Sequence, residues 1–505
     1  ALEINHSLRE RYDTEPLVRD ILDMSMAVEG LPRHASTHAA GVVISKLPLD
    51  EYVPLYSSDK GPATQFNMTT IEELGLLKMD FLGLRNLTLL RNALDLIREN
   101  RGIEIDFSTM DYNDAATYEM IAEGNTEGVF QLESGGMTDF MKNLKPTCFE
   151  DIVAGISLYR PGPMDSIPKY IENKKHPEQI RYVDPHLEPI LGVTYGCLVY
   201  QEQVMQIVRD LGGYSYGRSD LVRRAMSKKK ASVMAKERQN FVYGNVEEGV
   251  PGCIANGISE EIANKIYDEM TDFAKYAFNK SHAAAYAVVS YQTAYLKYYY
   301  PVEFMAALMT SVIDNPGKVA EYIMVCRSMG ITILPPDINQ GESGFSVNGN
   351  SIRYALTAIK SVGRPVIDAV VSERKERGAY TNLQDFITRM ADKDINKKAI
   401  ENFIKAGALD SLGGTRKQFM SAYVQIMDHI VHDRKNNMAG QMSLFDLVDD
   451  SQKEEFDVKL PDVGEYSKEM LLSFEKEVLG VYISGHPLEE WEELWKKGIT
   501  NTTAD

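Results

Sequence analysis

The pattern of hydrophobic and polar positions predicts a chain built mainly of helices, with a few short strands. Leu17, Ile21, Leu22 and Met24 recur at helical spacing within residues 1–30. Residues 41–45 and 78–82 are short apolar runs of the kind that form strands. A helical pattern returns at residues 87–100 and continues to about residue 340, punctuated by proline and glycine. We therefore predict a predominantly helical α+β fold.

A smaller α+β module is expected at residues 341–440. Within it, residues 352–363 and 399–413 each have the pattern of a helix that ends near a glycine. Lys360 to Gly363 are predicted to form a tight hairpin turn whose free backbone N–H groups suit a phosphate; a plain helical turn is the alternative. Residues 446–460 are acidic and resemble a linker, and residues 466–480 are amphipathic.

The length and composition indicate a soluble multidomain protein. A chain of 505 residues is too long for one core and suggests three or four domains. The four cysteines form no C-x-x-C pair, which gives no support to a disulfide framework or a zinc ribbon. No apolar run is long enough to cross a bilayer, and the chain opens at Ala1 without a signal-peptide pattern. We expect a cytoplasmic chain that is part of something longer.

The charge is unevenly distributed along the chain. The net charge of −19 argues by itself against nucleic-acid binding. Residues 216–240, however, carry eight Lys or Arg and two acidic residues. A basic groove on an acidic body is therefore expected.

This basic stretch is predicted to be a helix capped by Ser219 or Asp220. Arg224 and Lys228 are four residues apart, so they share a face and repel each other unless an anion binds between them. A triphosphate suits such a face, since its oxygens match arginine forks. The candidate ligands of this phosphate are Arg223, Arg224, Lys228 and Lys229. A solvated basic face is the alternative.

Residues 273–301 are predicted to form a second helix with one polar stripe. Lys275, Asn279, His282 and Tyr286 recur at helical spacing among small alanines that allow a flat ligand to approach. His282 and Tyr286 are candidates to stack on a base, and Lys280 is a candidate phosphate contact beside Ser281. For Tyr295 and residues 298–300, burial in a core is the better interpretation.

Asp80 lies within an apolar strand pattern, LLKMDFLGL. A carboxylate there is costly unless a cation binds it, and Mg²⁺ commonly uses one or two carboxylates with substrate phosphates. Pairing with Lys78 or Arg85 is the alternative. His34 and His38 have a metal-compatible spacing but lack a third ligand, so zinc is disfavoured.

Two further features suggest contacts with partners. Arg160 lies at a proline-fixed turn, where it would contact DNA or a phosphate, or brace the turn. Residues 441–445 (QMSLF) place Leu444 and Phe445 in polar surroundings, which favours a docking peptide over folding back onto the chain. No phosphate-binding P-loop motif and no nucleophile triad is evident.

Taken together, these motifs resemble the alpha subunits of bacterial DNA polymerase III, the C-family polymerases, of the type without an inserted proofreading domain. The resemblance runs from about residue 30 to residue 490. It is carried by HAAGVVIS, LLKMDFLGLRNLTLL, GVFQLESGGM, LYRPGP, YGCLVYQEQVMQI, GYSYGRSDLVRRAMSKKK, FNKSHAAAYAVVSYQTAYLK, ILPPDIN and LGVYISGHPL.

The resemblance implies a palm related to the nucleotidyltransferase-beta fold, large helical fingers and a helix-hairpin-helix module. The implied boundaries are the end of a thumb at 1–30, the C-terminal part of the palm at 31–85, fingers at 86–340, the helix-hairpin-helix module at 341–440, a sliding-clamp peptide at 441–445, and at 446–505 an acidic linker with a helical lead-in to an oligonucleotide-binding domain.

The resemblance also implies two-metal nucleotidyl transfer from dNTPs to a primer 3′-hydroxyl. Asp80 matches the third of three aspartates that hold two Mg²⁺ ions, with Lys78 beside it. The other two aspartates are expected upstream, so the chain alone is expected to be inactive. The matching nucleotide-binding residues are Arg223, Arg224, Lys228, Lys229, Asn279, Lys280, Ser281, His282 and Tyr286.

Other implied contacts involve DNA and replication proteins. Arg160, Lys360 and Gly363 are expected to contact primer–template DNA, and Gln441, Leu444 and Phe445 to bind the sliding clamp. A clamp loader and a separate proofreading exonuclease are further implied partners, and no membrane is implied. A non-catalytic, clamp-tethered DNA-binding scaffold is the alternative. A metal-dependent phosphoesterase is a second alternative, but it needs His/Asp clusters that the sequence lacks.

Overall fold

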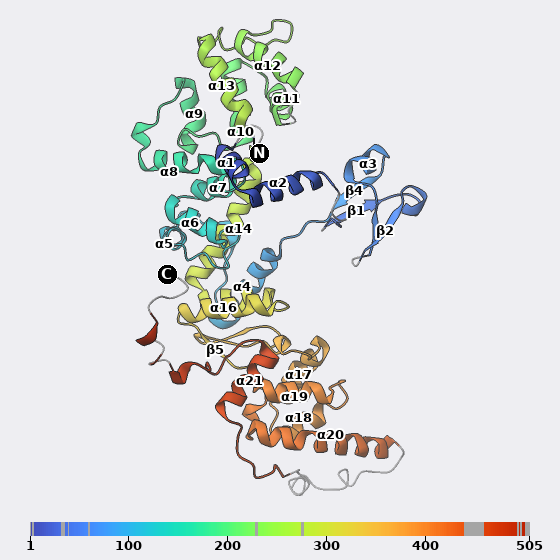
Figure 1. Ribbon diagram of the computed structural model, residues 1–505. Coiled ribbons are helices and arrows are strands. Elements are labelled where there is room, and N and C mark those ends of the chain that lie inside the picture. The colour runs from blue at the N-terminus through green and yellow to red at the C-terminus, as the bar shows by residue number, and fades with distance from the viewer. Residues whose placement is uncertain are drawn as a thin grey trace. The chain divides into compact units, whose positions relative to one another are not determined.

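The computed structural model describes residues 2, 5–31, 36–38, 40–58, 61–227, 231–273, 277–438, 459–491, 494 and 497–499. It divides into two compact units, residues 1–84 and 85–505. Both are labelled by element in Figure 1. The fold is predominantly helical with a few short strands, as the sequence predicts. Over the described ranges, no helix has the length and apolar character needed to span a membrane.

Unit 1 consists of two helices and a small α/β segment. Its elements are α1 (His6–Thr14), α2 (Pro16–Val28), β1 (Gly41–Ile44), β2 (Leu55–Ser58), β3 (Gly61–Thr64), α3 (Met68–Glu73) and β4 (Leu77–Asp80). β1 pairs antiparallel with β4, and β2 pairs antiparallel with β3.

The core of unit 1 is small. Its buried cluster consists of Val53, Ile71 and Leu76, with Val43 and Leu49 packed against it. In the β1–β4 pair, Val42 faces Met79 and Ile44 faces Leu77. These four side chains are exposed, so one face of this sheet is apolar and is not covered by the described residues.

Unit 2 contains the remaining elements. The helices before its sheet are α4 (Arg85–Arg101), α5 (Ala115–Ala122), α6 (Gly135–Leu144), α7 (Phe149–Leu158), α8 (Ile167–Lys175), α9 (Glu188–Leu191), α10 (Gln201–Gly212), α11 (Tyr216–Ser227), α12 (Ala231–Tyr243), α13 (Glu260–Phe273), α14 (Lys280–Tyr299), α15 (Pro301–Ser311) and α16 (Pro316–Ser328). The sheet and the helices after it are β5 (Thr332–Leu334), β6 (Ser346–Asn348), β7 (Ser351–Arg353), α17 (Arg364–Arg377), α18 (Leu383–Met390), α19 (Lys397–Ala406), α20 (Arg416–Met438) and α21 (Lys468–Leu479).

The long helix α14 links two of the hydrophobic cores of unit 2 (Figure 1). Ala283, Ala287 and Tyr291 lie in the core formed with α5, α6 and α7. Val289 and Leu296 lie in the larger core that α4, α15 and the later elements share. Helices α9 to α13 enclose a third core. The alanines of α14 therefore serve close helix packing along one side.

A return segment, residues 459–487, closes the C-terminal part of unit 2. Its helix α21 packs on α19. The buried carboxylate of Glu475 accepts hydrogen bonds from the backbone N–H groups of Ile483 and Ser484 at 2.9 and 3.1 Å. The Glu465 carboxylate accepts the N–H of Arg416 at 2.9 Å, at the start of α20. The return segment is thus hydrogen-bonded within itself through Glu475 and to the start of α20 through Glu465.

The structure corrects three local predictions. Residues 352–363 do not form a helix, because Ile352 pairs with Val347 and Ile333 in the β5–β7–β6 sheet and Ser361 has a left-handed φ of 61°. α11 begins at Tyr216, so neither Ser219 nor Asp220 is its cap. α14 begins at Lys280, because the extended backbone of Asn279 ends the helical register.

Candidate nucleotide-binding site

Two stretches predicted to bind a nucleotide meet at the start of α10. The guanidinium Nη1 of Arg223, on α11, donates to Gln201 Oε1 at 2.9 Å. The Gln201 Nε2 donates to the carbonyl of Ala277 at 2.9 Å, and its backbone N–H donates to the carbonyl of Phe278 at 2.8 Å. Gln201 therefore joins α11 to the segment that leads into α14.

The next residue, Glu202, fixes the first turn of α14. Its carboxylate accepts Nδ2 of Asn279 at 2.9 Å and the backbone N–H of Lys280 at 3.0 Å. Asn279 Oδ1 accepts the N–H of His282 at 2.8 Å. Asn279 is thus the helix cap, with its amide oxygen and nitrogen both engaged inside the protein. The sequence pattern did not single out Gln201 or Glu202, although both lie in the motif YGCLVYQEQVMQI.

The arginines of α11 differ in how free they are. Asp220 accepts Nη2 of Arg223 at 2.7 Å and lies 2.7 Å from Nε of Arg224. The hydrogen bond from Arg223, with both positive charges, holds the pKa of Asp220 below its usual range. The Arg223 side chain is 19% exposed, whereas that of Arg224 is 63% exposed. Arg224 is therefore the better placed of the two to receive an anion from solvent. Lys228 and Lys229 lie outside the described residues.

An aromatic row lies beside the first turns of α14; it consists of Phe278, His282, Tyr286 and Phe130. Successive ring centroids are 5.5, 4.3 and 5.2 Å apart. The Arg160 guanidinium lies 4.6 Å from the Phe278 ring and extends the row at the α14 start. His282 is exposed and the three other rings are partly buried, which leaves faces and edges available for stacking. Phe278 and Phe130 were not predicted, although each stands in a quoted motif.

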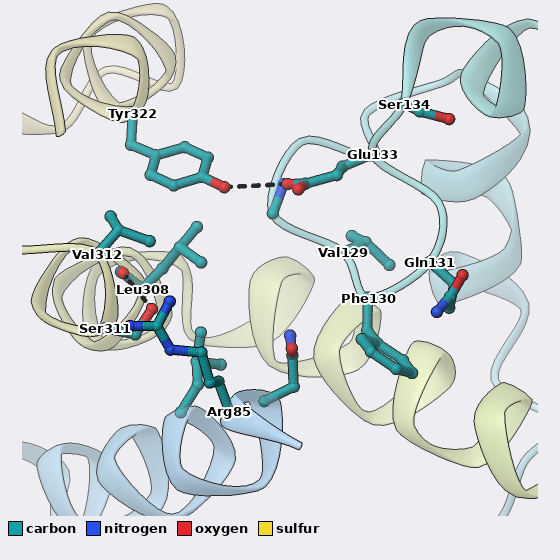
Figure 2. A pocket seen from close by; sticks show the side chains of 13 residues that line it. Arg85, Val129, Phe130, Gln131, Glu133, Ser134, Leu308, Ser311, Val312 and Tyr322 are labelled. Carbon is teal, nitrogen blue, oxygen red and sulfur yellow. Dashed lines mark hydrogen bonds between the residues drawn. The ribbon is translucent and has the colours of Figure 1, made fainter. Parts of the chain in front are cut away.

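A cavity of about 460 Å³ adjoins the row at Phe130 (Figure 2). Figure 2 shows Tyr322 and Glu133 facing each other across it, joined by a hydrogen bond from Tyr322 Oη to the Glu133 carboxylate of 3.0 Å. Arg85, Leu308 and Val312 also line it.

The two remaining polar residues at the start of α14 point to different surroundings. The Lys280 Nζ is 3.1 Å from a Glu150 carboxylate oxygen and 5.2 Å from the Tyr200 ring centroid. Ser281 is exposed. Lys280 is therefore paired with a carboxylate, as Arg224 is with Asp220, but the Lys280 side chain is 33% exposed and that of Arg224 is 63% exposed.

Asp80 is in unit 1, at the end of β4. Lys78 Nζ lies 2.7 Å from Asp80 Oδ1 and, by its hydrogen bond, lowers the pKa of Asp80. The pairing considered as an alternative thus exists, but the Asp80 side chain is 41% exposed rather than buried. His38 Nδ1 accepts the N–H of Gly41 at 2.7 Å and lies 3.8 Å from Asp80 Oδ1. The strand prediction for this segment is confirmed.

Comparison with known proteins identifies the family. Residues 1–83 match the family model "Bacterial DNA polymerase III alpha NTPase domain", residues 86–249 match "Bacterial DNA polymerase III alpha subunit finger domain", and residues 330–419 match "Helix-hairpin-helix motif". Proteins named DNA polymerase III subunit alpha from Thermus aquaticus, Borreliella burgdorferi and Bacillus subtilis are 44%, 43% and 42% identical, each over 97% of this chain. The chain belongs to the bacterial DNA polymerase III alpha subunit family. It spans 39%, 42% and 42% of these relatives' lengths.

The predicted site residues lie in different matched regions of the chain. Asp80 lies in the NTPase-domain match, and Arg223 and Arg224 lie in the finger-domain match. α14 lies outside all three matches, although the relatives cover 97% of the chain. The contacts through Gln201 and Glu202 connect the start of α14 to the finger-domain match, and packing on α5 and α7 connects the rest of the helix to it.

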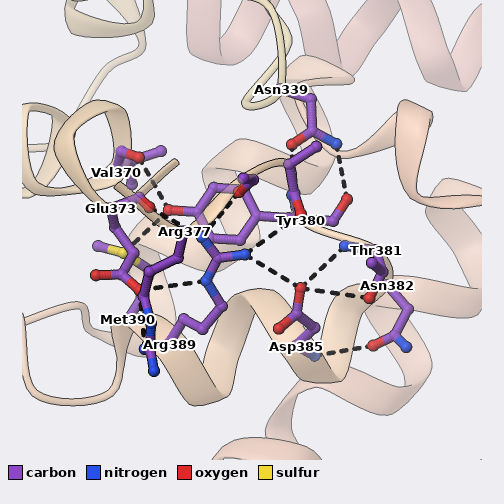
Figure 3. Close-up of polar contacts among 12 residues, drawn as sticks. Asn339, Val370, Glu373, Arg377, Tyr380, Thr381, Asn382, Asp385, Arg389 and Met390 are labelled. Atoms are coloured by element: carbon purple, nitrogen blue, oxygen red, sulfur yellow. Dashed lines mark hydrogen bonds and ion pairs between the residues drawn. The ribbon is translucent and has the colours of Figure 1, made fainter. Parts of the chain in front are cut away.

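In the region that matches the helix-hairpin-helix motif, Arg389 holds the helices together (Figure 3). Its guanidinium carbon lies 4.2 Å from the Tyr380 ring centroid, and its Nη2 donates to the carbonyls of Glu373 and Gly378 at 3.0 and 2.9 Å. Carbonyls at the end of α17 are thereby satisfied by a cation, which suits the negative end of the helix dipole.

The predicted hairpin turn is engaged from one side. The backbone N–H of Lys360 donates to the Val478 carbonyl at 2.9 Å, and its Nζ donates to the Glu477 carbonyl at 2.9 Å. The prediction of a free N–H is therefore wrong at Lys360, because the return segment occupies it. Gly363 is exposed and precedes α17. Gln441, Leu444 and Phe445 lie outside the described residues.

Proposed function

We propose that this chain supplies part of the centre that adds deoxynucleotides to a primer 3′-hydroxyl under the direction of a DNA template. The observation that carries the proposal is the convergence of α11 and the start of α14 on Gln201 and Glu202. An arginine open to solvent and a row of aromatic rings then belong to one surface of unit 2. Such a surface suits a triphosphate attached to a stacked base.

Each residue of this surface has a proposed role that follows from its contacts. Arg224 binds the triphosphate, because its side chain is exposed while Asp220 holds its guanidinium at Nε. Arg223 positions α11 through Gln201. His282 and Tyr286 bound the space for the nascent base pair, with Ser281 beside them, and Lys280 would contact phosphate only after leaving Glu150. Asn279 shapes the site by capping α14.

Asp80 is the proposed Mg²⁺ ligand of this chain. Its exposed carboxylate fits one position in the shell of a hard cation, and Lys78 sits where it balances the charge. No cluster of three potential ligands occurs within the described ranges, so Asp80 would need partners, and the two further aspartates expected from the family resemblance would supply them. When bound, Mg²⁺ supplies Lewis-acid stabilisation of phosphate charge.

Further contacts complete the proposal. Arg160, at the α14 start, and Gly363, before α17, would meet the DNA backbone, as would Lys360 if the return segment releases its ammonium. Gln441, Leu444 and Phe445 would bind a sliding clamp; this rests on the sequence alone. Together these contacts support the proposal that the chain acts in chromosomal replication with dNTPs, primer–template DNA and other replication subunits.

The test is primer extension with the polymerase chain that contains these residues and its native upstream sequence. Arg224→Ala should raise the KM for dNTP or lower kcat by about tenfold or more, because a charged hydrogen bond is worth ~1.5–3 kcal/mol. Arg209→Ala is the matched control, since Arg209 is an exposed arginine of α10 that pairs with Asp210 outside this surface. Unchanged kinetics for Arg224→Ala would contradict the assignment.

Asp80→Ala tests the catalytic half of the proposal in the same chain. Extension should be lost while binding to primer–template persists, because the substituted group holds the metal and not the DNA. If Asp80→Ala extends primers normally, the non-catalytic scaffold becomes the better description, and Asp80 is then only the partner of Lys78.

A further inference from the structure

The segment at residues 125–134 is held rigidly against α14. The buried Lys297 Nζ donates to the carbonyls of Asn125 and Glu127 at 2.9 and 2.8 Å. Thr293 Oγ1 accepts the N–H of Phe130 at 3.1 Å. Gln131, the next residue, has a left-handed φ of 64° and an exposed side chain. A non-glycine residue in that conformation is strained, and such strain persists where the surroundings impose it.

The cavity beside this segment has the walls of a nucleobase site rather than a phosphate site. Its volume of about 460 Å³ lies within the ~300–1,000 Å³ typical of ligand pockets. Leu308, Val312 and Phe130 supply apolar walls for the faces of a planar ring. Gln131 and Asn86 supply amide groups that can pair with the edge of any base.

Charge inside the cavity points the same way. The Glu133 carboxylate is fixed there by the Gly128 N–H at 3.1 Å and Tyr322 Oη at 3.0 Å. A negative group in the cavity wall repels a phosphate but accepts hydrogen bonds from the amino group of a base. Arg85 lines the cavity from α4, and within the described ranges no carboxylate pairs with it. A cation there is available to the phosphate of a nucleotide whose base enters the cavity.

The aromatic row leads to this cavity, since Phe130 belongs to both. Base–aromatic stacking tolerates every base, which suits a strand whose sequence varies. Arg160 stands at the other end of the row. The cavity and the row therefore form one continuous surface with an arginine at each end.

We propose that the Phe130 end of this surface, next to the nascent base pair at His282 and Tyr286, binds the unpaired template strand ahead of the primer terminus. The cavity between α4, the 125–134 segment and α15 then receives one unstacked template base. The proposal rests on the proposed function, because it requires primer–template DNA at the start of α14. It assigns Phe130 and Gln131 to template binding and Arg85 to a template phosphate.

The experiment compares two DNA substrates with the same paired length, one blunt and one with a single-stranded template overhang. The overhang carries the fluorescent base 2-aminopurine at successive positions, and binding is measured by titration with the whole chain. Phe130→Ala and Phe130→Leu should each weaken binding to the overhang substrate about tenfold, because the stacking ring is lost. Both should leave blunt-duplex binding unchanged and abolish the position-specific 2-aminopurine change. Phe130→Leu keeps apolar packing, which guards against misfolding.

Tyr298→Ala is the matched control, since Tyr298 is an exposed aromatic residue of α14 outside the row. It should change neither affinity. Equal weakening of both substrates by the Phe130 variants, or no weakening, overturns the template-base assignment while the proposed polymerase function stands. If the unaltered chain binds neither substrate, the proposed function fails and this inference fails with it.

Discussion

The two units bury their apolar residues to very different extents. In unit 2, α15 alone buries every residue from Val302 to Met309, and the core around it extends from α4 to the return segment. In unit 1 the buried cluster is Val53, Ile71 and Leu76, while the sheet that carries Asp80 leaves Val42 and Met79 exposed. The proposed phosphate-binding and stacking surface therefore belongs to a unit with large buried cores of its own. The proposed metal ligand belongs to a two-stranded sheet with one exposed apolar face.

Amide hydrogen exchange tests the difference in burial between the two units most broadly. We expect the amides of β1 and β4 to exchange at least about 100-fold faster than those of α15, because local opening free energies scale with buried contacts. Mass spectrometry of peptides from the two units measures the difference. Equal protection in both would show that the small cluster of unit 1 is sufficient, and the contrast drawn above would be wrong.

Glu475→Ala removes a fully buried carboxylate from unit 2. The change leaves the N–H groups of Ile483 and Ser484 without their acceptor, and Arg416 loses a carboxylate 3.8 Å away. We expect the free energy of unfolding of unit 2 to fall by about 3–5 kcal/mol. Thermal or denaturant unfolding followed by circular dichroism measures it. Glu477→Ala is the control: its side chain is 50% exposed and pairs with Lys405, so the loss should be below about 1 kcal/mol.

Gly41→Val sharpens the comparison within unit 1. Gly41 faces Asp80 across the β1–β4 pair, and a Cβ at Gly41 would lie 2.7 Å from Lys78 Cε and 3.0 Å from Asp80 Oδ1. We expect a loss of about 1–3 kcal/mol in unit 1 and displacement of the Lys78 side chain. Gly75→Ala is not a suitable control because of its φ of 76°; Gly83→Ala, which meets no atom within 4 Å, is suitable and should be neutral.

The smallest expected effect is electrostatic. Lys78→Met should raise the pKa of Asp80 toward its ordinary value, because the Lys78 hydrogen bond is the main cause of its lowering. The lowered pKa stabilises unit 1 above the unfolded-state value of 3.8, and this contribution disappears as the pH falls through the folded-state pKa. Carboxyl NMR titration measures the shift. An unchanged Asp80 pKa in Lys78→Met would mean that the 2.7 Å pair does not persist in solution.

Sequence patterns predicted the elements with long periodic runs and missed features set by tertiary contacts. The strand at Asp80, the helix at 87–100 and the helix of residues 466–480 were expected and are present. The helix expected at 352–363 is absent because long-range pairing with β5 and β6 recruits Ile352 into a sheet, which no local pattern reveals.

The site shows the same division. The basic and polar character of Arg223 and His282 was evident from residue types, but Gln201 and Glu202 became visible only when two distant helices met. Asn279 was expected to contact the nucleotide, and in the structure its side chain caps the start of α14. Phe130, 156 positions before Tyr286, could not be joined to the aromatic row by periodicity at all. Residue types therefore indicated which side chains could bind a phosphate or stack on a base. Tertiary packing determines which of those side chains are exposed and which are engaged inside the protein.

Helix α14 is long enough that a small tilt at one end would displace the other end by a few ångströms. Its 20 residues span about 30 Å at ~1.5 Å per residue. One end carries Lys280 and His282, and the other is embedded beside α4 and α15. A tilt of about 5° at the embedded end moves the opposite end by about 2.6 Å over that length. A tilt of this size would break the hydrogen bonds that Glu202 makes to Asn279 and Lys280, so packing deep in the larger core contributes to the geometry at the start of α14.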